Sequence, residues 1–277
     1  MENTLKLENS SFNDRLSSML RVDMRRMRHS RLFYIILACA LLIPVVMTVM
    51  LTMMDGTVSV DPQTGAETIM HGPDYVWQSI GTLPSDHPLT GSDMNAMGGM
   101  YVMSMCNINM MFMLVAVFIC LFISDDFRSG YAKNLFTVRA KKGEYVFSKT
   151  IIGFICGTLM LILYFIGSVL AGAMTGLSFG FVGFSAINLA MCMIAKIFLM
   201  LVFVSIFVLI SVAAKQKAWL SICGSLGGGM LLFMMVSMIT PLNSTLINVL
   251  LCTAGGILFA LGLGAASKLV LKKTSLV

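Results

Sequence analysis

The stretch ISDDFRSGYAKNLFTVRAKKGEYVFSK, residues 123–149, lies between two long apolar runs and carries much of the charge of the chain. Only 12% of the 277 residues are charged and 57% are hydrophobic, and the mean hydropathy is +0.88. A soluble core of this size does not bury that much apolar surface. A helix of about 20 apolar residues crosses a bilayer. The composition therefore predicts an all-α polytopic membrane protein in which the charged stretch is an aqueous loop.

Apolar runs on both sides of this loop predict six transmembrane helices within a single transmembrane domain, residues 1–277. Two turns inside long uncharged runs are indicated by the Gly- and Phe-rich segment 175–185 and by Pro241. The spans are expected at about 32–54, at about 101–124, from Lys149 to the first turn, from that turn to Ala214, and on either side of Pro241 between Ala218 and Ser267.

The positions of lysine and arginine predict the orientation, because cytoplasmic connectors are rich in these residues. Segment 1–31 has seven lysines and arginines, and the loop through Lys149 has six. The connector with Lys215 and Lys217 and the C-terminal segment with Lys268, Lys272 and Lys273 bring the total to 18 of the 19 basic residues. The connector 55–100 has none, but it has six acidic residues. We therefore expect both termini and the loop 125–148 in the cytoplasm, and 55–100 outside the cell as an irregular extracellular loop.

Three polar residues in or beside the predicted spans are candidates for a substrate path, namely Asn107, Asn109 and Lys196. Lys196 precedes Lys215 by 19 residues, which is about 28 Å along a helix. It is therefore expected near the outer boundary, where its stem can snorkel to the headgroups. The alternative is a charge that faces a substrate path. For the two asparagines, the alternative is hydrogen bonding between helices.

The N-terminal segment 1–31 contains an amphipathic helical pattern. Apolar residues recur at spacings of three and four, and arginines crowd the remaining surface. A helix of this kind lies flat on an anionic cytoplasmic leaflet. It serves either as a positive-inside anchor or as a mechanical elbow that leads into the first span, and the sequence leaves both open. The residues are Leu16, Met19, Leu20, Met24 and Met27, with Arg21, Arg25, Arg26 and Arg28.

No catalytic or cofactor motif accompanies these features. The cysteines and histidines do not have the spacing of metal ligands, so no metal site is expected. No catalytic residue is expected either. No acidic residue lies within a predicted span, which disfavours a proton- or sodium-coupled transporter. The glycine-rich segments 224–229 and 262–269 lack the P-loop pattern, so this chain is expected to bind no cofactor. An energy source would then be another polypeptide.

The charged loop itself contains the pattern of a short helix. Ser129 and Gly130 can end a turn, and Tyr131, Leu135 and Val138 follow at helical spacing. Such an amphipathic helix can dock in a groove of a partner. The alternative is an ordinary solvated loop.

The loop resembles that of ABC transporter type-2 permeases, which has an acidic pair, a basic residue, a glycine, a short helix, a basic segment and a lysine that opens the third span. The six-span layout and the basic amphipathic helix also match, so the resemblance covers essentially the whole chain. The matching positions are Asp125 and Asp126, Arg128, Gly130, residues 131–138, Arg139, Lys141 and Lys142, and Lys149.

The resemblance implies the permease subunit of a bacterial ABC exporter in the plasma membrane, paired with a second permease copy or a related permease. It implies two separate ATP-binding cassette ATPase subunits, which would hold ATP and Mg²⁺, and export of a peptide, a bacteriocin or an amphipathic drug. Asp125, Asp126, Arg128 and Lys133 would orient the coupling helix, and Arg139 would meet the ATPase. Coupling to the ATPase is thus expected of Asp125, Asp126, Arg128, Gly130, Lys133 and Arg139.

The outer loops depart from the family pattern. Many members have their large insertion between the fifth and sixth spans, whereas here the first outer connector is the long one, which argues against polysaccharide- or sterol-type substrates. Two other functions stay open: a non-transporting membrane anchor or sensor whose extracellular loop binds a ligand, and a membrane enzyme. Nucleic acid is not expected as a partner, because topology accounts for the net charge of +6.

Overall fold

The computed structural model describes residues 12–52, 58–60, 67–69, 76–77, 79–81, 107–138, 142–176 and 184–273. Nearly all of these residues are helical, which confirms the all-α fold class. The helices are α2 (Phe12–His29), α3 (Arg31–Thr52), α6 (Met110–Arg128), α7 (Tyr131–Val138), α8 (Lys142–Met174), α9 (Ala186–Ala214), α10 (Ala218–Ile239) and α11 (Leu246–Lys273), and the strands are β1 (Val58–Val60) and β2 (Glu67–Ile69).

Five of the helices in the described part of the chain are long and apolar enough to cross a membrane: α3, α6, α8, α9 and α11. The chain is therefore a multi-pass membrane protein. The remaining predicted span corresponds to α10, which has 22 residues, but its described apolar stretch, Ala218–Phe233, is shorter than those of the other five.

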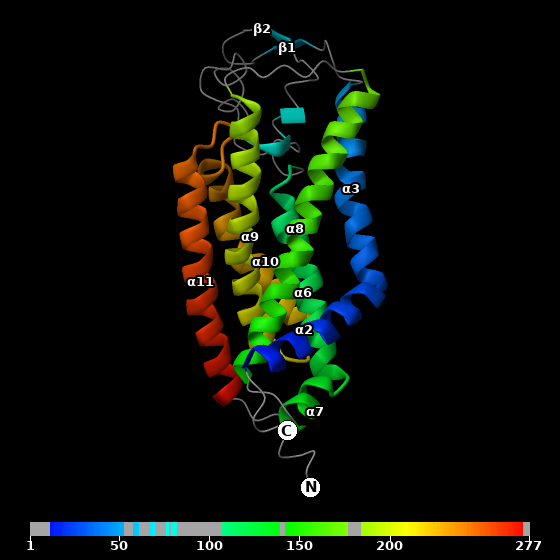
Figure 1. Ribbon diagram of the computed structural model, residues 1–277. Helices are drawn as coiled ribbons and strands as arrows, with labels where there is room; N and C mark the ends of the chain where they lie inside the picture. Colours follow the sequence, from blue (N-terminus) through cyan, green and yellow to red (C-terminus); the bar gives the residue numbers. More distant parts are fainter. Residues whose placement is uncertain are drawn as a thin grey trace.

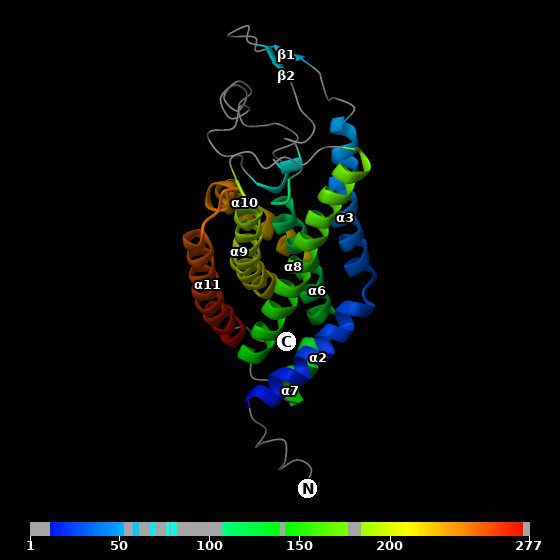
Figure 2. The same cartoon turned by 45° about the horizontal axis from the view of Figure 1, so that its top comes forward.

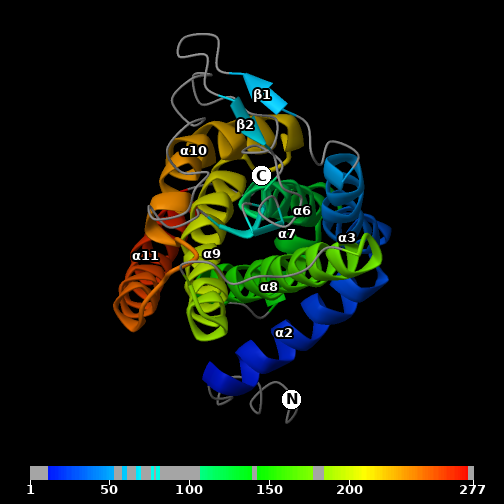
Figure 3. The same ribbon diagram turned by 90° about the horizontal axis from the view of Figure 1, so that it is seen from above.

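The long helices form an elongated bundle with α2 and α7 across one end and the strand pair beyond the other (Figures 1 and 2). Seen from above, α8 lies between α3 and α9, and α11 packs on the far side of α9 (Figure 3). Helix α9 also contacts α6 and α10. The core consists of the buried apolar side chains between these helices. The end that carries α2 and α7 is called the inner end below, and the opposite end the outer end.

Helix α8 begins at Lys142 rather than at Lys149, where the sequence pattern placed the start of the third span. Its 33 residues extend for about 50 Å, which is longer than the hydrocarbon layer of about 30 Å. The first turns stay helical because Tyr145 and Val146 are buried in the core. Lys149 is therefore inside a continuous helix, two turns from its beginning.

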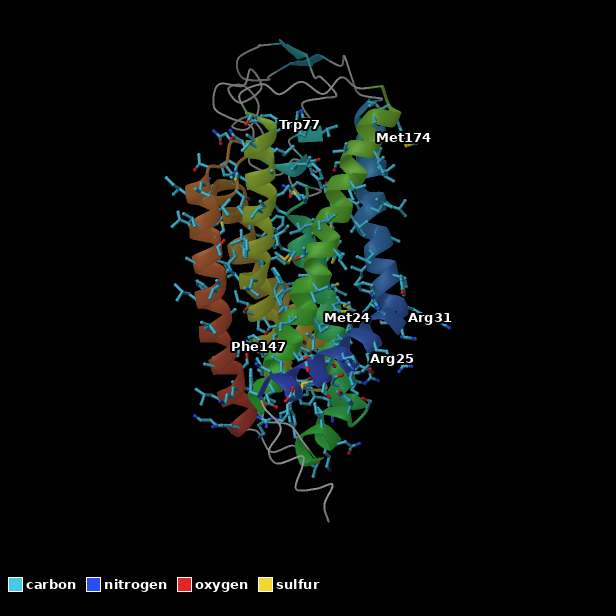
Figure 4. The ribbon with its side chains drawn as sticks, in the orientation of Figure 1. Met24, Arg25, Arg31, Trp77, Phe147 and Met174 are labelled. Carbon is cyan, nitrogen blue, oxygen red and sulfur yellow. The ribbon has the colours of Figure 1, made fainter. Side chains whose placement is uncertain are left out.

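The connector 55–100 contains regular structure that the sequence analysis did not predict. Strands β1 and β2 pair antiparallel, with Val58 opposite Ile69, as their β-branched residues favour. The nearby Trp77 is buried at the outer end of the bundle, with its ring 5.4 Å from that of Phe184. Figure 4 shows Trp77 at the opposite end of the bundle from Arg25. Part of this connector thus packs onto the helices.

Candidate coupling site

The turn between α6 and α7 is built as the sequence pattern predicts. The Ser129 hydroxyl donates to the backbone oxygen of Asp125 at 2.7 Å and ends α6. Gly130 has φ +75°, a left-handed conformation that glycine adopts without a steric cost. Helix α7 then begins at Tyr131 and runs across the inner end of the bundle, beneath α2 (Figure 1).

A cluster of four buried or half-buried charges lies directly above this turn. Lys149 of α8 donates to Asp126 of α6 at 2.7 Å and to Asp23 of α2 at 2.8 Å. Arg26 of α2 donates to Asp126 and lies 3.8 Å from Asp23. Two acids and two bases from three helices thus neutralise one another. We call Asp23, Arg26, Asp126 and Lys149 the ion cluster.

Two hydroxyl groups of α8 complete the hydrogen bonds of the ion cluster. Ser148 donates to the second oxygen of Asp23 at 2.7 Å, and Tyr145 donates to Asp126 at 2.9 Å. Buried charges are costly unless they are paired and hydrogen-bonded. With these hydroxyls in place, every carboxylate oxygen of Asp23 and Asp126 has a partner.

Aromatic rings surround the two cations of the ion cluster. Lys149 Nζ lies 4.4 Å from the ring centre of Phe122, and Arg26 Cζ lies 4.4 Å from that of Tyr131. Such cation–π contacts attract both cations to the faces of these rings. The contact with Tyr131 also ties the first residue of α7 to the cluster.

The same surroundings shift two pKa values at the inner end. Burial raises the pKa of Tyr131, and the carboxylates of Asp23 and Asp126 raise it further. Burial alone would lower the pKa of Arg26, but the nearby carboxylates of Asp126 and Asp23 outweigh it, so the pKa of Arg26 is raised. Tyr131 therefore stays neutral and Arg26 stays charged over the physiological pH range.

The ion cluster joins α2, α6 and α8 at the point where α7 begins. Removing one partner of a buried ion pair typically costs about 3–5 kcal/mol, because the other charge stays buried. The ion cluster therefore holds α2, α6 and α8 to one another beside the first residue of α7.

The six residues predicted for coupling fall into different environments. Asp126 is fully buried in the ion cluster, whereas the side chain of Asp125 is 71% exposed and 3.7 Å from Arg26. Arg128 and Lys133 are exposed, and Gly130 forms the turn. Arg139 lies outside the described residues.

The apolar side of α7 faces the protein itself, which differs from the expectation that it docks into a partner. Ala132 is buried, and Leu135 and Phe136 pack against the core. The Phe136 ring lies 5.2 Å from that of Tyr145. The surface that α7 leaves open to a partner is instead polar. Among the residues of α7 whose burial is described, the exposed ones are Lys133, Asn134 and Thr137.

The sequence analysis did not single out Asp23, although it is a member of the ion cluster. One signal was present in the sequence: Asp23 is an acid in an otherwise basic helix, and it is four residues from both Met19 and Met27 of the apolar stripe. An acid on the buried side of an amphipathic helix indicates a buried cationic partner.

At the outer end, Lys196 is fully buried, so the expectation that it snorkels to the headgroups is wrong. Its ammonium donates to Asn109 and to Thr240, at 2.8 Å each. The side-chain oxygen of Asn107 accepts from the backbone of Asn109 at 2.9 Å. The three path candidates therefore lie together: Asn107 and Asn109 come just before α6, and Lys196 is about three turns into α9 from its outer end. Lys196 stays inside because these oxygens solvate it there.

Within the described residues, no group of three or more histidine, cysteine, aspartate or glutamate side chains is placed to hold a metal ion. The inner end has a set of ion pairs whose charges balance, the ion cluster, and beside it the exposed polar face of α7.

Comparison with known proteins supplies the family. No curated protein and no solved structure matches the chain. The family model described as ABC-2 family transporter protein matches residues 19–230, which is more than half of the chain and includes the ion cluster and α7. The chain therefore belongs to the ABC-2 family of transporter proteins.

Proposed function

We propose that this chain is the membrane-spanning permease subunit of an ATP-binding cassette exporter, and that a separate ATPase subunit energises it. The observation that carries the proposal is the ion cluster, which joins α2, α6 and α8 and contacts the first residue of α7 through Arg26 and the Tyr131 ring. A helix held in this way can transmit the movement of a docked subunit to the spans. Family membership supports the transport role.

The ATPase would dock on the inner end, in the cytoplasm of a bacterial cell. Lysine and arginine are concentrated in the segments at this end, as expected for the cytoplasmic side. The exposed Asp125, Arg128 and Lys133 offer charges of both signs to a partner. The nucleotide and its Mg²⁺ would be held by the ATPase.

The substrate class that we propose is a peptide, a bacteriocin or an amphipathic drug, passed outward between this chain and a second permease. Lys196 and Asn109 are enclosed within one chain, so they would meet a substrate only when the outer ends of α6, α9 and α10 separate. Such an opening would expose an ammonium, which suits a substrate with an anionic group.

The test replaces the turn glycine. Gly130→Pro forces φ to about −65° at a residue that has φ +75°, and so it moves α7. Gly176→Pro makes the same backbone change at the outer end, where Gly176 has φ +73°, and serves as the matched control. Each variant is reconstituted in nanodiscs with the P-loop ATPase encoded beside the chain, and stimulated ATP hydrolysis and efflux from cells are measured.

We expect Gly130→Pro to insert into the membrane normally but to lose stimulated ATP hydrolysis and efflux. The Gly176→Pro variant should keep both activities. If Gly130→Pro transports as well as the native chain, α7 does not couple the ATPase to the spans, and the proposal is wrong.

A further inference from the structure

A small groove lies between α2, α7 and the first turn of α8, beside the ion cluster but separate from it. Its volume is about 70 Å³, and Arg15, Val22, Leu135 and Glu144 are among the residues that line it. Its lining residues come from α2, α7 and α8, and Figure 2 shows α2 and α7 at the same end of the bundle. A subunit that docks on the inner end across both α2 and α7 would lie beside this groove.

Glu144 is the unusual residue of this groove. Its side chain is only 3% exposed, and one carboxylate oxygen accepts from Arg15 Nε at 3.0 Å. The other oxygen, Oε2, is buried and has no hydrogen-bond partner among the described residues. Leaving a buried polar atom without a partner is costly, and the large majority of such atoms are satisfied. Within the described part of the chain, this oxygen is therefore open to a further donor.

We propose that Glu144 receives the tip of a lysine or arginine side chain of the docked ATPase, through its free oxygen. This deepens the proposed function and rests on it. A water molecule occupies about 30 Å³ in the liquid, so a groove of 70 Å³ holds an ammonium or guanidinium tip. It is too small for a phospholipid headgroup or for a transported peptide.

The apolar lining favours a cation with an aliphatic stem. Val22 and Leu135 present carbon atoms to the groove, and Glu144 presents the charge. Lysine and arginine bury such stems along apolar surface while the head finds an acceptor. A hydrogen bond to a buried charge is stronger than one between neutral groups, so the contact would decide which ATPase the permease accepts.

The test measures the dissociation constant of the purified ATPase on the chain in nanodiscs. Glu144→Gln keeps the shape but removes the charge, and we expect binding to weaken about ten- to hundredfold. Arg15→Gln removes the competing partner inside the chain and leaves both oxygens of Glu144 to the ATPase, so it should tighten binding. If Glu144 only ties α2 to α8, the two variants will weaken binding alike, and the proposal is overturned.

If Glu144→Gln folds poorly, a second pair of variants tests whether the ATPase occupies the groove. Val22→Lys places an amine at the groove, where it can fill the site, and it should weaken binding while Glu144 is intact. Ser17→Lys adds the same charge on α2 outside the groove and should leave binding unchanged. Equal binding by both lysine variants would overturn the proposal.

Two further outcomes separate the alternatives. If the effect of Glu144→Gln appears only in nanodiscs that contain phosphatidylethanolamine, the groove binds a lipid amine and the ATPase assignment is wrong. If the native chain does not bind the ATPase at all, the proposed function fails. If the native chain and Glu144→Gln bind equally well, only the assignment of Glu144 fails.

Discussion

Asp125 and Asp126 show how much a single position on a helix decides. Adjacent residues on a helix are separated by about 100°, so these two acids face different surroundings. The side chain of Asp125 is 71% exposed, while that of Asp126 is fully buried between Arg26 and Lys149. The pair looks symmetrical in sequence, but only Asp126 holds helices together.

The first prediction compares the same substitution at both acids. Asp126→Asn removes the charge that pairs with Arg26 and Lys149, and it should destabilise the chain by about 3–5 kcal/mol. Asp125→Asn removes an exposed pair worth at most about 1 kcal/mol. Thermal unfolding in detergent, monitored by size-exclusion chromatography, should show a lower melting temperature for Asp126→Asn but not for Asp125→Asn. Equal melting temperatures would mean that the ion cluster contributes nothing to stability.

Among the helices, α9 and α11 pack closely because a glycine lies between their backbones. A Cβ atom on Gly256 of α11 would lie 2.6 Å from the backbone oxygen of Phe198 in α9. Small residues allow this approach between transmembrane helices. The same helix has Gly262, where a Cβ atom would meet nothing within 4 Å.

The second prediction uses these two glycines. Gly256→Ala should lower the melting temperature, because a backbone oxygen cannot move aside as a side chain can, so α9 and α11 must separate. Gly262→Ala should be neutral or stabilising by about 0.5–1 kcal/mol, the helix propensity gained. If Gly256→Ala is as stable as Gly262→Ala, the close packing of α9 and α11 is not required.

At the scale of the whole molecule, the arrangement places α2, α7 and the end of α11 at one end of the bundle and the strand pair at the other (Figures 1 and 2). The described parts of the connector 55–100, which include β1, β2 and Trp77, lie at the second end (Figures 1 and 4). The proposed docking of an ATPase requires the first end to face the cytoplasm.

The third prediction tests this orientation. Lys133→Cys on α7 and Thr245→Cys at the outer end are both at exposed positions. An impermeant maleimide added to intact cells should label Thr245→Cys and should reach Lys133→Cys only after the membrane is made permeable. Labelling of the native cysteines in the unsubstituted chain gives the background signal. Labelling of Lys133→Cys in intact cells would reverse the orientation and rule out ATP-driven docking on α7.

Several features were predictable because they depend on local pattern. Gly130 and the residues after it predicted the turn and α7, and apolar runs predicted the spans. The ion cluster was not predictable in this way, because Asp23 and Lys149 are 126 positions apart in sequence. The snorkelling of Lys196 was predicted wrongly, because the distance along a helix does not say that its side chain faces Asn109 and Thr240.

The sequence by itself determined that this is a multi-pass helical membrane protein with its basic connectors gathered on one side. The length of an apolar segment decides whether it can cross the bilayer, and the lysines and arginines beside it decide which of its ends faces the cytoplasm. Both properties can be read from each segment without knowing its neighbours in the fold. Only the tertiary structure decided which charges are paired, because α2 must fold back over α8 before Asp23 can meet Lys149. That Glu144 Oε2 is buried without a partner among the described residues is likewise known only from the tertiary structure. The burial of a side chain depends on the residues packed around it.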